Sequence, residues 1–259
     1  MWTIEPTDRP GAFLVRSPDG REQSHVDLDD PTYLAFDYVR RMADIVDTYG
    51  VAGDPVRVVH VGGAGLTLPR YLSATRPGSN QIVLEPDETV TDLVRRDLPL
   101  PRRSGIKVRA VSGRAGVFAL RDQSVEVMVL DAFSEGSTPL DLLSVEQVEH
   151  VARVITESGW YVLNLAGGAP FQGIRRALAA VRTAFPHVLV GAEPATLRGR
   201  REGNLVVVAS RAPLPLAALR KCAASSPAPY RVLDDRQTSD TLGGGRPWTD
   251  AEIGILTTD

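Results

Sequence analysis

The residues best suited to bind or transform a ligand each follow an apolar run of the sequence. Gly62, Gly63 and Gly65 come after the first such run, Glu85 after the second and Asp131 after a later one. In open α/β sheets, ligands bind beyond the carboxyl ends of the strands, near the point where the strand order reverses. The sequence therefore predicts a site made of a glycine turn and two carboxylates at strand ends.

The glycine turn differs from the motifs that bind dinucleotides and nucleoside triphosphates. A dinucleotide fingerprint needs a third glycine, and Leu68 stands at that position after Gly63 and Gly65. A P-loop needs a lysine, and none lies near the turn, so NAD and ATP are both disfavoured. Glu85 follows Gly65 by 20 residues and can accept hydrogen bonds from both hydroxyls of a ribose, which favours a nucleoside such as S-adenosylmethionine. A glycine turn that serves packing alone is the alternative.

Asp131 and its neighbours have a structural and a functional interpretation. Asp131 can cap the turn that follows it, but a carboxylate at this place in an α/β sheet serves function more often. Phe133 is expected to form a wall of the core or of a pocket, and Glu135 is a weaker candidate for contact with a substrate.

Apolar runs alternate with amphipathic segments from residue 56 to residue 210, and this alternation predicts the elements that position the site. The expected strands cover residues 56–61, 81–85, 107–113, 125–133 and 160–166, and the expected helices cover 68–75, 88–97, 144–157 and 173–185. Continuous Val/Leu/Ile strands separated by helices are typical of a parallel sheet covered on both faces. Residues 187–193 and 204–210 have no helix between them and are expected to form an antiparallel hairpin. The predicted fold class is α/β.

Shorter segments flank this region. A hairpin is expected from strands at 12–16 and 22–28, followed by a helix over 31–49. The tail is rich in Pro, Ala and Ser, with one expected strand at 230–234. We expect an N-terminal hairpin and helix over residues 1–50, a nucleoside-binding domain over 51–210 and a loosely docked appendage over 211–259.

Composition excludes several classes of protein. The chain has 259 residues, a net charge of −3 and 43% hydrophobic residues, which suits a soluble globular protein and argues against a nucleic-acid partner. The one cysteine, Cys222, excludes an internal disulfide and suits a reducing cytoplasm. No apolar run reaches the roughly 20 residues that span a bilayer, and no signal peptide is visible, so we expect a cytoplasmic protein without a membrane partner.

Two further sets of residues have uncertain roles. The four histidines are scattered, and His60 is expected to be a hydrogen-bonded core residue, so we predict no metal site. Arg198, Arg200 and Arg201 lie between the two final strands. They are expected to be a solvated turn, with an anion or partner patch as the alternative.

Taken together, these motifs resemble those of the spermidine synthase (polyamine aminopropyltransferase) family, in its divergent bacterial members. The resemblance covers about residues 19–210 and rests on DGREQ, GGAGLTLPR, EPD, SGRAG and DAFSEG in succession. It implies a Rossmann-like, methyltransferase-type sheet with a small N-terminal β unit, and a homodimer formed through that unit. It also implies transfer of an aminopropyl group from decarboxylated S-adenosylmethionine to an amine, in polyamine biosynthesis.

The resemblance assigns roles to individual residues. Gln23 matches a glutamine near the thioether and aminopropyl part of the donor. Gly62 and Gly63 match the glycine turn, Glu85 the ribose acid and Asp131 the carboxylate that orients the amine.

The sequence departs from the family pattern at several of these positions. Gly65 stands where the family has the aspartate that meets the donor's amine, and Arg114 where an acid meets the adenine amino group. Ser134 replaces a second aspartate, with Glu135 adjacent, and residues 36–38 replace a Tyr-His-Glu sequence.

The expected activity is therefore that of a spermidine-synthase-like transferase. Its co-substrate is expected to be decarboxylated S-adenosylmethionine or S-adenosylmethionine, with no tightly bound cofactor. For a carboxylated donor, Arg114 is a candidate partner of the carboxylate. The alternatives are a methyltransferase that uses S-adenosylmethionine itself, and a catalytically silent Rossmann-like protein kept for binding or assembly.

Overall fold

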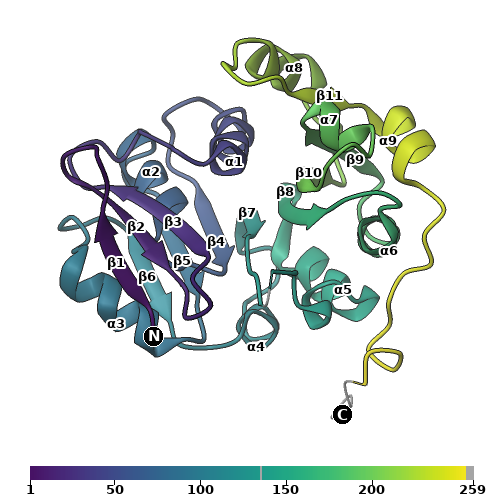
Figure 1. Cartoon of the computed structure of the whole chain (residues 1–259). Coiled ribbons are helices and arrows are strands. Elements are labelled where there is room, and N and C mark those ends of the chain that lie inside the picture. The colour runs from purple at the N-terminus through teal and green to yellow at the C-terminus, as the bar shows by residue number, and fades with distance from the viewer. Residues whose placement is uncertain (135, 255–259) are drawn as a thin grey trace. The chain divides into compact units, whose positions relative to one another are not determined.

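The computed structural model describes residues 1–134 and 136–254, and these described residues form two compact units that divide after Gly113 (Figure 1). Each unit contains strands and helices in alternation. No helix among the described residues is long and apolar enough to cross a membrane.

The first unit begins with a three-stranded antiparallel sheet in the order β1-β2-β3. Its strands are β1 (Thr3–Pro6), β2 (Ala12–Arg16) and β3 (Glu22–Asp27). The predicted hairpin is confirmed as β2 and β3, joined by a turn in which Gly20 has a φ of +82°. Strand β1 was not predicted from the sequence because its four residues are mostly exposed and show no apolar alternation.

Helix α1 (Asp37–Asp47) begins six residues after the predicted start at Pro31. The Asp27 Oδ1 atom accepts hydrogen bonds from the backbone N–H groups of Asp29 and Asp30, at 3.0 and 2.8 Å. The Asp30 carboxylate in turn accepts one from the Thr32 N–H at 3.1 Å. These side-chain turns compete with helix formation, so the predicted helical start was wrong.

Three parallel strands follow in the first unit, in the order β4-β5-β6. They are β4 (Arg57–Val61), β5 (Asn80–Leu84) and β6 (Ile106–Arg109), and the helices between them are α2 (Thr67–Thr75) and α3 (Glu88–Asp97). Helix α3 has the predicted bounds because the Asp87 side chain caps it, accepting hydrogen bonds from the backbone N–H groups of Thr89 and Val90. Strand β6 ends four residues before its predicted end.

The second unit contains parallel strands β7 (Val125–Leu130) and β8 (Ile155–Gly167). Ser144 caps helix α5 (Val145–Val154) as predicted, and its Oγ accepts a hydrogen bond from the Gln147 N–H at 3.2 Å. Strand β8 is longer than predicted, since it starts directly after α5. The other helices before the tail are α4 (Gly113–Phe118), which was not predicted, the 3₁₀ helix η1 (Leu140–Leu142), α6 (Gln172–Val181) and α7 (Pro194–Leu197).

The predicted antiparallel pairing of the last two strands is confirmed as β9 (His187–Ala192) and β10 (Gly203–Ser210). The expectation that no helix lies between them was wrong, because the short helix α7 does. Strand β10 lies between β8 and β9 and is antiparallel to both. Parallel strands covered by helices, together with this antiparallel end, confirm the α/β class and its Rossmann-like type.

The tail is more regular than the sequence indicated. It contains α8 (Leu216–Ala224), β11 (Arg231–Leu233) and α9 (Asp235–Leu242). Strand β11 confirms the strand expected near residue 230 and pairs antiparallel with β9, so the tail extends the sheet of the second unit. A capping box between Asp234 and Gln237 starts α9.

Candidate functional site

The glycine turn after β4 has a backbone that few residues other than glycine adopt. Gly62 has a φ of +89° and donates a hydrogen bond to the Leu84 carbonyl oxygen at 3.0 Å. Ala64 and Leu66 also have positive φ angles, of 36° and 62°. A Cβ atom on Gly63 would lie 2.7 Å from Val83 Cγ1, closer than real side chains approach. The turn is therefore held tightly against β5.

Glu85 lies one residue beyond β5 and holds this turn in place. Its Oε2 atom accepts hydrogen bonds from the backbone N–H groups of Gly63, at 3.0 Å, and Ala64, at 3.4 Å. Its Oε1 atom accepts one from the Asp87 N–H at 3.0 Å. The structure thus brings Glu85 and the glycine turn together. A carboxylate oxygen offers about two acceptor positions, so Glu85, with three of its four in use, keeps one on Oε1 for a hydroxyl of a ribose.

Gly65 packs against the N-terminal sheet. Its N–H donates to Ser24 Oγ at 3.0 Å. A Cβ atom on Gly65 would lie 2.7 Å from Ser24 Cβ, 2.9 Å from Val26 Cγ2 and 3.1 Å from Val15 Cγ2. There is consequently no space for an aspartate side chain at this position.

Gln23, the remaining candidate in the first unit, lies on β3 beside Ser24. Its side chain is half-buried, and its Nε2 donates to Ser17 Oγ at 3.2 Å in the turn between β2 and β3. Its assigned role near the donor remains a prediction.

Asp131 follows β7 directly and is held by a neighbouring strand of the second unit. Asn164 on β8 donates a hydrogen bond from Nδ2 to Asp131 Oδ1 at 2.9 Å. Burial raises the pKa of Asp131 from 3.8 to about 6, and the hydrogen bond from Asn164 partly opposes that rise. A carboxyl group with this pKa is ionised at neutral pH and can still take a proton from an attacking amine.

Asn164 was not identified from the sequence. It is fully buried, and its Oδ1 atom has no hydrogen-bond partner among the described residues. A buried polar atom normally has a partner, so this oxygen beside Asp131 keeps acceptor capacity that no described residue uses. The indication in the sequence was a single amide inside the apolar run WYVLNLA.

The residues after Asp131 form a small turn. Ser134 and Ser137 exchange two backbone hydrogen bonds, Ser134 N–H to Ser137 O at 2.9 Å and Ser137 N–H to Ser134 O at 3.0 Å. Phe133 is half-buried beside them. Glu135, the candidate substrate contact, lies outside the described residues.

Arg114 is bound to the C-terminal segment of its own unit. Its guanidinium forms a two-pronged ion pair with Asp250, whose side chain is 1% exposed. Arg114 Nη1 also donates to the Asp141 carbonyl oxygen at 3.0 Å. The backbone of Asp250 is fixed in turn by a hydrogen bond from its N–H to Glu146 Oε2 at 3.0 Å. No pattern in the sequence indicates Asp250 as the partner of Arg114.

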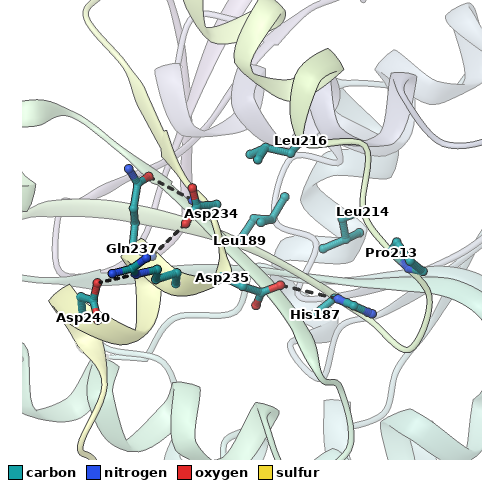
Figure 2. Close-up of a pocket in the computed structure, with 10 residues that line it drawn as sticks. His187, Leu189, Pro213, Leu214, Leu216, Asp234, Asp235, Gln237 and Asp240 are labelled. Carbon is teal, nitrogen blue, oxygen red and sulfur yellow. Dashed lines mark hydrogen bonds and ion pairs between the residues drawn. The ribbon is translucent and has the colours of Figure 1, made fainter.

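A pocket of about 600 Å³ lies elsewhere in the second unit, at the amino end of β9 (Figure 2). It is lined by His187, Leu189, Pro213, Leu214, Leu216, Asp234, Asp235, Arg236, Gln237 and Asp240. Its carboxylates already serve structural contacts: Asp235 accepts from the Val188 N–H at 2.7 Å, and Asp234 pairs with Arg220 at 3.2 Å. Strands β7, β8 and β9 run in the same direction, so this pocket lies at the opposite edge from Asp131.

Comparison with known proteins gives no match from the sequence but clear matches from the structure. No family model and no curated protein matches this sequence. A crystal structure of a probable spermidine synthase from Corynebacterium glutamicum matches the chain with a TM-score of 0.90 and 26% identity, over 100% of this chain and 95% of that one. The chain is spermidine-synthase-like. The family resemblance inferred from the motifs is thereby confirmed.

More distant structures share the fold. A spermidine synthase in complex with the transition-state analogue AdoDATO matches with a TM-score of 0.56 and 14% identity, over 99% of this chain and 85% of that one. Human methyltransferase-like protein 13 in complex with SAH matches with a TM-score of 0.54 and 18% identity, over 85% and 94%. The Rossmann-like methyltransferase architecture is therefore common to this chain and to both kinds of transferase.

Proposed function

We propose that this chain binds a nucleoside of the S-adenosylmethionine type and transfers its aminopropyl group to an amine. The donor is assigned to the glycine turn and Glu85, and the amine to Asp131. The observation that carries the proposal is the pairing of Asp131 with Asn164 at the end of β7, which leaves one buried amide oxygen without a partner in the part of the chain that the structure describes. The likeness to a probable spermidine synthase over the whole chain supports the same assignment.

The chemistry requires little of the protein beyond orientation and proton transfer. The amine attacks, through its lone pair, the carbon attached to the sulfonium sulfur. A C–N bond forms, the C–S bond breaks, and sulfur keeps the bonding electrons as a neutral thioether. The new ammonium then loses a proton, which the Asp131 carboxylate accepts or passes to water. The Asn164 Oδ1 atom, as a second acceptor, would orient the N–H groups of the amine.

Transfer of a methyl group is the second candidate, because a methyltransferase-like structure that shares the fold holds SAH. The same displacement then occurs at the methyl carbon of S-adenosylmethionine, and the leaving thioether keeps the carboxylate of the donor. The glycine turn and Glu85 would serve both donors. The two reactions differ in the donor that the chain prefers.

Calorimetry with three nucleosides separates these functions. We expect decarboxylated S-adenosylmethionine and methylthioadenosine to bind. A preference for S-adenosylmethionine would favour methyl transfer, and binding of none of the three would exclude both transferases in favour of a silent binding protein.

Turnover with a panel of amines then tests Asp131. Asp131→Asn should lower kcat by about 10²–10⁴-fold and leave donor affinity nearly unchanged, since general-base catalysis contributes factors of that size. Asp92→Asn, at an aspartate that is 76% exposed on α3, is the matched control and should have no effect. Unchanged turnover in the Asp131 variant would remove this residue from its role.

The proposal also includes the assembly and location implied by the resemblance. We propose a cytoplasmic homodimer, formed through the sheet β1-β2-β3, that acts in polyamine biosynthesis or a related pathway. Light scattering on the full chain tests the dimer: a monomeric mass at micromolar concentration would contradict it.

A further inference from the structure

Three arginines, Arg198, Arg200 and Arg201, form an exposed cluster between α7 and β10, which we call the arginine loop. Arg201 forms an ion pair with Glu193. In the described part of the chain, neither Arg198 nor Arg200 has an ion pair with a carboxylate. Glu202 is the other acid of residues 193–202, so this stretch holds three arginines and two glutamates.

The arginine loop lies at the edge of the sheet that carries Asp131. Strands β7, β8 and β9 run in the same direction, and the loop follows the carboxyl end of β9 (Figure 1). Leu130 is opposite Leu163, and Gly167 at the end of β8 is opposite Gly203 at the start of β10. Strand spacings of about 4.8 Å and rises of about 3.3 Å per residue place the base of the loop roughly 15 Å from Asp131.

Close packing fixes the loop against the segment that follows β8. A Cβ atom on Gly199, which has a φ of +68°, would lie 2.8 Å from Ala169 Cβ. A Cβ atom on Gly168 would lie 2.8 Å from Glu202 Cγ. These glycines let the backbones approach closely. The loop is therefore held beside the strand that carries Asn164.

This arrangement suits an acceptor with charges of both signs. An amine group would lie at Asp131 and Asn164. The Asn164 Nδ2 donor is already bound to Asp131, so the atoms left for the amine are acceptors: the carboxylate oxygens and Asn164 Oδ1. A second amine at the distance of a polyamine chain would approach arginines, and like charges repel. A carboxylate or phosphate at that distance would instead meet guanidinium groups, which bind such anions through two parallel hydrogen bonds.

We propose that the acceptor is an amine that carries an anionic oxygen group, which Arg198 and Arg200 bind. This inference rests on the proposed transfer reaction, and it replaces a polycationic acceptor by one with an ammonium end and an anionic end. The bond that forms is still the C–N bond described above. The arginines fix the far end of the acceptor and take no part in proton transfer.

Binding measurements on the full chain test this proposal. The probes are 4-aminobutyrate, O-phosphoethanolamine and 1,4-diaminobutane, each titrated by ligand-observed NMR with and without methylthioadenosine. We expect one of the two anionic amines to bind more tightly than the diamine. A preference between them identifies the anion as carboxylate or phosphate. Tighter binding of the diamine would overturn the proposal.

The double variant Arg198→Ala/Arg200→Ala locates the anion. Loss of charge-assisted hydrogen bonds should raise the Kd of the anionic amine by about tenfold or more, whereas loss of the repulsion should lower the Kd of the diamine. Arg236→Ala, at an exposed arginine on α9, is the matched control and should leave every Kd unchanged. An unchanged Kd for the anionic amine in the double variant would refute the assignment to the arginine loop.

The donor titration distinguishes this inference from the proposed function. If no nucleoside binds while an anionic amine binds in an arginine-dependent manner, the transfer reaction is excluded and the anion site stands. If nucleosides bind and the diamine is the better acceptor ligand, the transfer stands and the anion site is excluded.

Discussion

Replacing Asp131 by asparagine should stabilise the protein at neutral pH. The side chain keeps its shape, and its Oδ1 can still accept the hydrogen bond from Asn164 Nδ2. Its new Nδ2 can in addition donate to the Asn164 oxygen that lacks a partner. The variant thus removes a half-buried charge without opening a cavity.

The size and pH dependence of the effect follow from the raised pKa of Asp131. Below pH 3.8 the group is protonated in both the folded and unfolded states. Between pH 3.8 and about 6 the folded state holds a proton that the unfolded state has released, so the free energy of unfolding falls as the pH rises. At about 1.36 kcal/mol per pKa unit the full difference is about 3 kcal/mol. Because the side chain is only half-buried, we expect about 1–3 kcal/mol after solvent screening.

Chemical denaturation of the wild type and the variant from pH 3.5 to 8 measures this effect. The difference in free energy of unfolding should be small at pH 3.5, grow between pH 4 and 6, and stay constant above that range. Asp92→Asn, at an exposed aspartate, should show no such step. A difference that is independent of pH, or a less stable variant at pH 7.5, would refute the reasoning.

Three further substitutions test the contacts described above. Gly65→Ala should lower the free energy of unfolding by about 1–3 kcal/mol in urea denaturation, because the new methyl group would overlap Ser24. Asp250→Asn should cost about 2–3 kcal/mol, since it leaves Arg114 without its buried counter-ion, and should speed hydrogen exchange in residues 243–254. Glu85→Gln should weaken nucleoside binding by about tenfold or more in calorimetry, because the ribose loses a charged acceptor.

Each of these three tests has a control variant or an outcome that would contradict it. Gly173→Ala, on α6, places its methyl group 3.7 Å from Trp248 and should not destabilise the protein. Arg114→Gln should add little to the cost of Asp250→Asn in a double-mutant cycle, and additive costs would show that the two side chains are not coupled. For Glu85→Gln, unchanged affinity would return the glycine turn to a purely structural role.

Elements with local determinants were predictable from the sequence. Helix α3 has its predicted bounds because Asp87 caps it within three residues. His60 is confirmed as a core residue: its Nε2 lies 2.9 Å from Gln81 Oε1, and burial lowers its pKa to about 4. The start of α1 was missed because the carboxylates of Asp27 and Asp30 bind backbone N–H groups in the segment before it, which an apolar stripe does not reveal.

The contacts that were missed at the candidate site are distant in sequence. Gly65 donates to Ser24, 41 residues away, and Arg114 binds Asp250, 136 residues away. Nothing in the local pattern at either position indicates these partners. The carboxylates at strand ends could be found from the alternation of elements alone, whereas Asn164 became visible only once β7 and β8 were paired.

The departures from the family pattern have a physical explanation that bears on activity. Internal contacts occupy the space around both residues. The N-terminal sheet packs against Gly65, and Arg114 forms an ion pair with the C-terminal segment. Glu85 and Asp131, in contrast, keep defined partners and spare hydrogen-bonding capacity around them. A protein that had lost all catalysis would have no need to keep a carboxylate whose half-buried charge costs about 1–3 kcal/mol of stability at neutral pH. Under the proposed transfer reaction, the changes at Gly65 and Arg114 accompany a changed substrate, and an amine with an anionic group is the change that the arginine loop supports.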